Sequence, residues 1–268
     1  MKSSVKKTTT SSHRPLIALE PWIRGIPMEE LLTFAKDVGF DGIEYMLTLR
    51  DLMFGPSRIL ALSKKHNMPI ISLHQPLLLL INTPSFLFPR MLETAKLFPD
   101  VALINHHVSA FMFTKPSATS ALLYKKMFEN AGFVVSYESN PAKHMFSTLY
   151  AKPTYDAIAY QTFCNENQLP INLDVCHIAS VGYDIVKFFS ENYKNIRLIH
   201  LSDFKNGIQH LPIGEGELQI KELLQEIKHK KWDGNITFEI FRFPNQQSKK
   251  QKFFSLEKSL TFVHENLQ

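Results

Sequence analysis

Residues 27–46, PMEELLTFAKDVGFDGIEYM, contain one complete helix-turn-strand unit. Pro27 suits the first position of a helix, and the residues after it place apolar side chains at helical spacing. Gly39 can end that helix, because glycine readily adopts the left-handed conformation found at helix C-termini. The turn that ends at Gly42 leads into a short apolar segment of strand length. This stretch therefore predicts a helix followed by a buried strand.

Similar apolar segments recur along the whole chain. The eight predicted strands are Leu16–Glu20, Gly42–Met46, Ile70–His74, Val101–His107, Phe133–Glu138, Ile171–Asp174, Ile196–Leu201 and Ile236–Ile240. Most intervals between them have helical patterning, and this alternation is typical of repeated βα units with a parallel sheet. The chain has 268 residues, close to the roughly 250 of one α/β barrel. We therefore predict an α/β protein with a single (β/α)8 TIM barrel over residues 15–268.

The N-terminal segment differs in composition from the rest. Residues 1–14 contain four cations and no acid, among many Ser and Thr residues, which predicts a disordered basic tail. The net charge of the chain is +5, so the tail leaves only +1 on residues 15–268. This small surplus is weak support for a barrel that binds nucleic acid over a broad surface.

Other features of the sequence bound its location. No apolar run approaches the ~20 residues of a membrane-spanning helix, so no membrane association is predicted. The two cysteines, Cys164 and Cys176, occur without an apolar signal segment, which argues against a secreted disulfide framework. A cytoplasmic location is predicted, with both cysteines as buried small residues. Between two predicted elements, residues 77–90 contain Pro84 and Pro89 and are predicted to form a loop, either over the barrel mouth or against the helices.

Histidines and carboxylates gather where the predicted strands end. They are His74, His107, Glu138, Asp174, His177, His200, His210 and Glu239. The carboxyl ends of the strands share one rim of a parallel barrel, so these side chains should converge on one pocket. Imidazole and carboxylate together suit Zn, Mn, Fe or Co, whereas Mg and Ca sites use mainly oxygen ligands. The sequence therefore predicts a divalent-metal site.

Local patterns refine the candidates. Adjacent His106 and His107 should point to opposite faces of a strand, and His107 is favoured as the ligand because it lies nearer the strand's C-terminal end. Asp174 and His177 place a carboxylate on a strand and an imidazole one turn later. Lys205 and Arg242 are candidates for binding a substrate phosphate, although each is also an ordinary surface cation.

With these residues, the chain resembles the xylose-isomerase-like barrel superfamily, which contains sugar phosphate isomerases and epimerases and the endonuclease IV branch of DNA repair. The motifs that carry the resemblance are Glu30–Ala35, Gly39–Glu44, Glu138–Asn140, Asp174–His177, His200–Asp203, His210–Glu217 and Glu239. The resemblance covers nearly everything after residue 14.

The resemblance implies a divalent-metal-dependent sugar or sugar-phosphate isomerase or epimerase. In this interpretation Glu138, Asp174, His200 and Glu239 form the primary metal site, and His177 joins it or contacts substrate. The metal, Mn, Zn or Co in one to three ions, would hold adjacent oxygens of a keto-sugar and stabilise an enediolate. Glu138 and Glu239 would exchange the carbon-bound proton from opposite faces. The substrate is a small carbohydrate, and the oligomeric state stays open.

The alternative is an AP endonuclease of the endonuclease IV type, which binds three metals and hydrolyses a phosphodiester at abasic DNA. The resemblance implies that His74, His107, His177 and His210 are then additional metal ligands. Two departures weaken this alternative. Ile208 stands where that branch has an acidic residue two positions before its ligand histidine, and the segment Gln75–Leu80 directly after His74 offers no aromatic or Arg to enter a duplex. The isomerase is therefore preferred, and nucleic acid is a partner only under the alternative.

Overall fold

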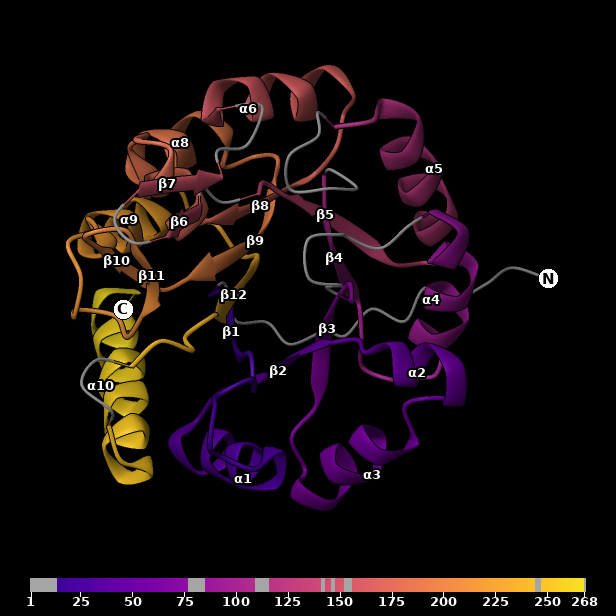
Figure 1. Cartoon of the computed structure of the whole chain (residues 1–268), viewed down its shortest axis with the longest axis horizontal. Coiled ribbons are helices and arrows are strands. Elements are labelled where there is room, and N and C mark those ends of the chain that lie inside the picture. The colour runs from indigo at the N-terminus through magenta and orange to yellow at the C-terminus, as the bar shows by residue number, and fades with distance from the viewer. Residues whose placement is uncertain are drawn as a thin grey trace.

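Eight parallel strands close into one barrel in the computed structural model (Figure 1). The structure describes residues 14–76, 85–108, 116–140, 143–145, 148–151, 156–243 and 247–267. The barrel order is β1-β12-β9-β8-β5-β4-β3-β2, with β1 paired to β12 at the closure. The barrel strands are β1 (Leu16–Leu19), β2 (Gly42–Met46), β3 (Ile70–His74), β4 (Leu103–His107), β5 (Val134–Glu138), β8 (Ile171–Asp174), β9 (Ile196–Leu201) and β12 (Asn235–Phe238). The predicted α/β class and (β/α)8 architecture are confirmed.

Helices surround the barrel and cover the outer face of its strands (Figure 1). They are α1 (Met28–Val38), α2 (Leu49–Phe54), α3 (Ser57–His66), α4 (Phe88–Ala95), α5 (Ala118–Glu129), α6 (Ala157–Glu166), α7 (Val175–Ser180), α8 (Ile185–Asn192), α9 (Ile220–His229) and α10 (Lys249–Leu267), with a 3-10 turn η1 (Ser85–Leu87). Apolar side chains from helices and strands form a continuous buried core between the two layers.

The unit from Pro27 to Met46 forms as its sequence predicts. Pro27 precedes α1, and Gly39 follows it with a left-handed φ of 98°. Its N–H donates to the carbonyl of Ala35, which satisfies a carbonyl at the helix end. Gly42 then begins β2, where a Cβ would meet the backbone oxygen of Pro69 at 3.0 Å. The turn thus brings β2 close enough to pair with β3.

The bounds of four predicted strands differ by one or two residues from those observed, at β1, β4, β5 and β12. The eighth barrel strand was predicted over Ile236–Ile240 and instead ends at Phe238, so Glu239 lies just beyond it. The loop predicted over residues 77–90 is wrong at its end, because η1 begins at Ser85 and α4 at Phe88. Pro89 lies in the first turn of α4, where no helical N–H bond is lost. Residues 77–84 lie outside the described residues.

Two hairpins that the sequence did not predict interrupt the βα repeat. They are β6 (Lys143–Met145) with β7 (Thr148–Ala151), and β10 (Asp203–Lys205) with β11 (Ile208–Leu211). Asp203 accepts hydrogen bonds from four backbone N–H groups, that of its neighbour Phe204 and those of Gly214, Gly216 and Leu218 in the segment after the second hairpin. A Cβ on Gly216 would lie 2.1 Å from Asp203 Oδ1, so only glycine fits there.

The remaining predictions about the chain are tested only in part. The predicted disordered tail lies outside the described residues except for Arg14, whose guanidinium pairs with Asp41 at 2.7 Å. Cys164 and Cys176 are buried free thiols, as predicted. In the part of the chain that the structure describes, every helix is too short or too polar to cross a bilayer.

Candidate metal centre

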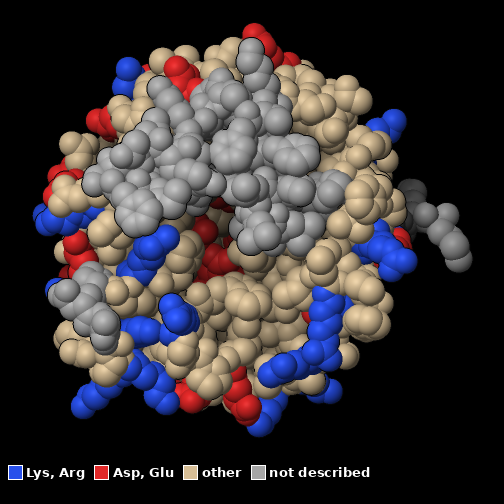
Figure 2. All heavy atoms as spheres, in the orientation of Figure 1, with Lys and Arg blue, Asp and Glu red and all other residues tan. Residues whose placement is uncertain are grey.

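The eight predicted site residues gather inside the C-terminal mouth of the barrel. All eight are buried: His74, His107, Glu138, Asp174, His177, His200, His210 and Glu239. Figure 2 shows carboxylate side chains at the base of the central hollow. Side chains from separate strand ends meet there because a parallel barrel directs all its carboxyl ends to one rim.

Four of these residues form a compact quartet. Glu138 ends β5, Asp174 ends β8, His200 lies on β9 and Glu239 follows β12, and one ligand atom of each lies within 4.8 Å of the others. His200 Nδ1 is 3.3 Å from Glu138 Oε2 and 3.1 Å from Glu239 Oε2. This is the quartet that the resemblance implies as the primary metal site.

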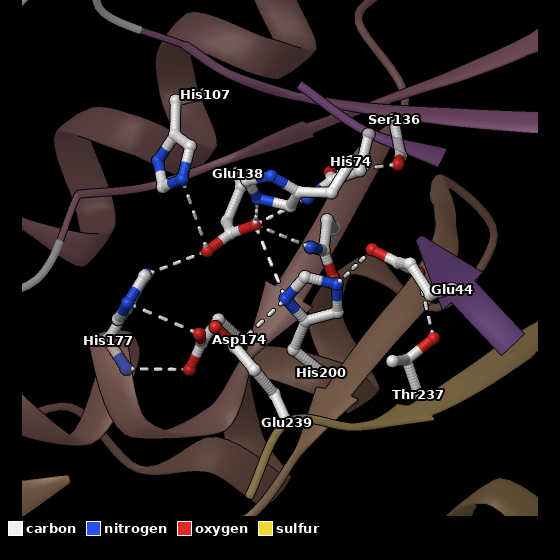
Figure 3. A network of polar contacts seen from close by, with 12 residues as sticks. Glu44, His74, His107, Ser136, Glu138, Asp174, His177, His200, Thr237 and Glu239 are labelled. Atoms are coloured by element: carbon white, nitrogen blue, oxygen red, sulfur yellow. Dashed lines mark hydrogen bonds and ion pairs between the residues drawn. The ribbon is translucent and has the colours of Figure 1, made fainter. Parts of the chain in front are cut away.

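Two triads adjoin the quartet and share residues with it. One is His74, His107 and Glu138, and the other is Asp174, His177 and His210. Figure 3 shows the imidazoles of His74, His107, His177 and His200 converging on Glu138. Each triad again satisfies the 4.8 Å limit between ligand atoms. Glu138 and Asp174 thus belong to two groups each.

An outer group orients each of four histidines. The contacts are His74 Nδ1 with the Gln75 carbonyl at 2.7 Å, His107 Nδ1 with Asn140 Oδ1 at 3.0 Å, His177 Nδ1 with the Ser139 carbonyl at 2.7 Å, and His200 Nε2 with Glu44 Oε1 at 2.9 Å. When each acceptor takes an N–H from its ring nitrogen, the other nitrogen can offer a lone pair to a metal bound among the carboxylates. This arrangement is common around metal-ligating histidines.

Several inward-facing atoms of the quartet have ion-pair contacts with one another or with His177 but no hydrogen-bond partner. They are Asp174 Oδ2, His200 Nδ1 and Glu239 Oε2, all fully buried. Leaving buried polar atoms unsatisfied costs free energy, and a cation between these atoms would satisfy all three together. The donor set of imidazole nitrogen and carboxylate oxygen therefore fits a divalent transition metal.

Two buried carboxylates complete the centre, and neither was predicted as a site residue. Glu44 contacts His200 and accepts hydrogen bonds from Ser72 Oγ at 2.9 Å and Thr237 Oγ1 at 2.8 Å. Glu20 follows β1, and burial raises its pKa to about 7. Both positions stand out in the sequence, because an acidic residue within or directly after an apolar strand is expected to be buried, and acidic residues are rarely buried unless they are paired.

The charges of the centre depend strongly on one another. Burial alone would raise the pKa of Glu138, but the neighbouring histidines outweigh burial and hold it well below its usual range. Burial raises the pKa of Glu239 well above its usual range. Burial would lower the pKa of His200, yet the carboxylates around it raise that pKa well above normal. In the metal-free centre, protonated imidazole thus compensates part of the carboxylate charge.

His106 and His107 separate as predicted. His107 Nε2 lies 3.8 Å from Glu138 Oε1, whereas the His106 ring stacks on Tyr124 with centroids 4.0 Å apart. His106 therefore belongs to the layer between strands and helices.

His210 reaches the centre from β11 rather than from a barrel strand. Its φ of 62° is left-handed, an uncommon conformation for a residue other than glycine. The surroundings hold it there: its N–H donates to Cys176 Sγ at 3.4 Å, and its carbonyl accepts from the N–H of Arg242 at 3.1 Å. In this left-handed backbone conformation, the His210 imidazole lies beside Asp174 and Glu239.

The predicted substrate-binding cations lie in different settings. Lys205 on β10 forms a 3.6 Å ion pair with Glu217, and its contact with substrate stays a prediction. Arg242 lines a cavity on the rim, beside Phe241. Ile208, at the position where an acid was noted to be missing, is 49% exposed and adds no ligand to the centre.

Comparison with known families agrees with this architecture. A family model described as xylose isomerase-like TIM barrel matches residues 119–256, more than half of the chain. The chain belongs to this family. The predicted resemblance is thereby confirmed, and the matched range includes all four residues of the quartet and the second hairpin. No curated protein sequence matches the chain.

Solved structures with the same fold include two sugar epimerases and one nuclease relative. The 3-keto-D-glucoside 4-epimerase of E. coli matches with a TM-score of 0.71 and 17% identity, over 94% of this chain and 100% of that one. The D-allulose 3-epimerase of Methylomonas sp. gives 0.70 and 14%, over 94% and 97%. The AP endonuclease, family 2, of Brucella melitensis gives 0.67 and 14%, over 94% and 98%. At these identities the likeness concerns the fold, and function has to come from the site.

Proposed function

We propose that the protein is a divalent-metal-dependent isomerase or epimerase of a sugar or sugar phosphate. The observation that carries the proposal is the quartet, in which Glu138 and Glu239 both approach His200 Nδ1, at 3.3 and 3.1 Å. Two buried carboxylates held this close together suit proton removal and return at one carbon. The sugar epimerases among the structural neighbours support the same class of substrate.

In the proposed reaction, a divalent metal, Mn, Zn or Co, would supply Lewis-acid polarisation of the substrate carbonyl. One glutamate removes the proton next to the carbonyl, and the C–H electron pair moves toward the carbonyl oxygen to give an enediolate. The glutamate on the other face then returns a proton to carbon. Asn105 and Asn172 donate hydrogen bonds to Glu138 Oε2, which fixes the direction of that carboxylate.

The test is deuterium incorporation from heavy water into keto-sugars, with the metal-loaded protein and a panel of sugars with and without phosphate. We expect carbon-bound exchange in the wild type and a loss of roughly 100-fold or more in Glu138→Gln and Glu239→Gln. Glu30→Gln, a surface carboxylate that pairs with Lys249, is the matched control. An absence of exchange across the panel would contradict the proposal.

A second candidate is a phosphodiesterase that acts on abasic DNA. The two triads favour it, because they add histidine-rich ligand groups on both sides of the quartet. Several metals would then activate water and stabilise the charge on the leaving oxygen. Ile208 and the small net charge of residues 15–268 weigh against this candidate. Cleavage of an abasic-site duplex, with no exchange in any sugar, would reverse the order of the two.

A further inference from the structure

A basic cavity lies on the rim of the barrel, where the segments after β9 and β12 meet the segment after β1. Its volume is about 540 Å³, in the range of small-molecule sites. The described residues that line it include three cations, Arg24, Arg242 and Lys252, and no carboxylate. Phe241 and Phe243 supply apolar walls. Figure 2 shows the wider pattern, with Lys and Arg around the hollow and carboxylates at its base.

Two of the three cations are available to a ligand. Lys252 Nζ donates to the carbonyl of Arg24 at 2.7 Å and lies 5.6 Å from the Phe243 ring centroid. Lys252 therefore ties the segment that carries Arg24 to α10. Within the described part of the chain, the side chains of Arg24 and Arg242 form neither a hydrogen bond nor an ion pair. The cavity thus contains two guanidinium groups without a protein partner among the described residues, and the hydrogen bond from Lys252 holds the backbone that carries Arg24.

The cavity is joined to the metal centre through His210. The carbonyl of His210 accepts the backbone N–H of Phe241 at 3.3 Å and of Arg242 at 3.1 Å. The Phe241 ring stacks on the His210 imidazole with centroids 4.3 Å apart, and His210 Nδ1 lies 3.6 Å from Glu239 Oε2. Two stacked rings, those of Phe241 and His210, therefore lie between the basic cavity and Glu239. A ligand that reaches the centre over this wall keeps its other end beside the arginines.

We propose that this cavity binds the phosphoryl group of a phosphorylated carbohydrate, with Arg24 and Arg242 as its ligands. The inference rests on the proposed isomerase function and specifies its substrate as a phosphomonoester. Planar guanidinium groups bind phosphate oxygens in pairs, and barrel enzymes often hold phosphate in the loops after the seventh and eighth strands. In this barrel those strands are β9 and β12. The charge pattern orients the substrate, since the phosphoryl group is attracted to the rim and repelled by the carboxylates below.

A small phosphomonoester fits better than a DNA backbone. Duplex DNA presents phosphates over a long surface and needs an extended basic stripe. Here the free guanidinium groups converge on one cavity, and residues 15–268 carry a net charge of only +1.

The test measures binding to the full-length, metal-loaded protein by calorimetry, with fructose 6-phosphate, fructose and inorganic phosphate as probes. The variants are Arg24→Gln, Arg242→Gln and their combination. Arg50→Gln with Arg58→Gln is the matched control, because these arginines line a different cavity, beside Trp22 and Tyr45. We expect wild type and control to bind fructose 6-phosphate more tightly than fructose, and each cavity substitution to weaken that binding roughly tenfold. Inorganic phosphate should follow the same order.

The outcomes separate this inference from the proposed function. Equal affinity of wild type and the Arg24/Arg242 variant for fructose 6-phosphate overturns the phosphate site, even where deuterium exchange occurs. Arginine-dependent phosphate binding without exchange in any sugar supports the site and removes the isomerase. Arginine-dependent binding of abasic duplex, with no binding of fructose 6-phosphate or inorganic phosphate, overturns the inference in favour of DNA.

Discussion

Glu44 Oε1 lies 2.9 Å from His200 Nε2, and both side chains are fully buried. This contact determines which nitrogen of His200 faces the quartet, because Glu44 accepts from Nε2 and leaves Nδ1 toward Glu138 and Glu239. Ser72 and Thr237 hold the second oxygen of Glu44, so the carboxylate cannot swing away. Glu44 is therefore a positioning residue for a candidate metal ligand.

Glu44→Gln should weaken metal binding without unfolding the barrel. The amide keeps the shape of the side chain but removes the charge that strengthens the bond to His200. Substitution of a residue that hydrogen-bonds a metal-ligating histidine typically lowers metal affinity 10- to 100-fold. We therefore expect a drop of roughly that size in affinity for Mn²⁺ or Zn²⁺. Competition titration with a chromophoric chelator measures it, with Glu30→Gln as the surface control. Unchanged metal affinity would show that Glu44 does not act through His200.

The two shared carboxylates should matter most for the amount of metal bound. Glu138 and Asp174 each belong to the quartet and to one triad, whereas His107 belongs to one triad alone. We expect Glu138→Gln and Asp174→Asn to lose more metal per chain than His107→Asn, by elemental analysis of dialysed protein. This order of metal loss is expected whether one ion or three are bound, because Glu138 and Asp174 each belong to two ligand groups. Equal losses in all three variants would refute it.

Removal of metal should lower thermal stability. A metal that binds only the folded chain contributes about 2.7 kcal/mol when its concentration is a hundred times its dissociation constant. For a chain of this size we expect chelation to lower the melting temperature by several degrees, since each kcal/mol is worth roughly 2–4 °C, and Mn²⁺ to restore it. Scanning calorimetry checks this, with Asp174→Asn as a variant whose response should be smaller. A melting temperature that does not change when chelator is added would contradict the presence of a metal bound to the folded chain.

Asp203→Asn should destabilise the fold rather than alter the chemistry directly. Two of the four N–H groups that the carboxylate accepts would face an amide NH₂ instead, in a site that is 2% exposed. We expect a loss of about 3 kcal/mol in the free energy of unfolding by urea. Asp184→Asn is the matched control, because Asp184 caps α8 through one N–H and asparagine is an equally good cap. Similar losses in both variants would contradict this account of Asp203.

The barrel and most of its centre could be predicted because both depend on local patterns. Period and length of the apolar segments located the strands, and the parallel barrel then placed residues such as His74 and Asp174 at one rim. Glu44 belongs to the motif Gly39–Glu44 but was not predicted as a site residue, although a carboxylate inside an apolar strand is itself unusual.

Other features depend on contacts that sequence spacing does not encode. Arg24 and Arg242 share a cavity only because β1 pairs with β12 at the barrel closure. The hairpin of β10 and β11 depends on Asp203 and on a left-handed His210, and neither follows from hydrophobic periodicity. Metal number, substrate identity and cellular location stay predictions.

The position of His210 on a hairpin has an evolutionary consequence. The barrel ladder fixes the quartet, and changes there disturb the core. The hairpin pairs with itself outside that ladder, so a substitution at Ile208 or His210, which leaves Asp203 and its hydrogen bonds in place, can add or remove a ligand without disturbing the barrel pairing. Placing an acid at position 208 or replacing His210 is expected to alter how many ions the centre holds while the scaffold persists. Descendants of one ancestral barrel can thus diverge in chemistry through a few residues of peripheral chain.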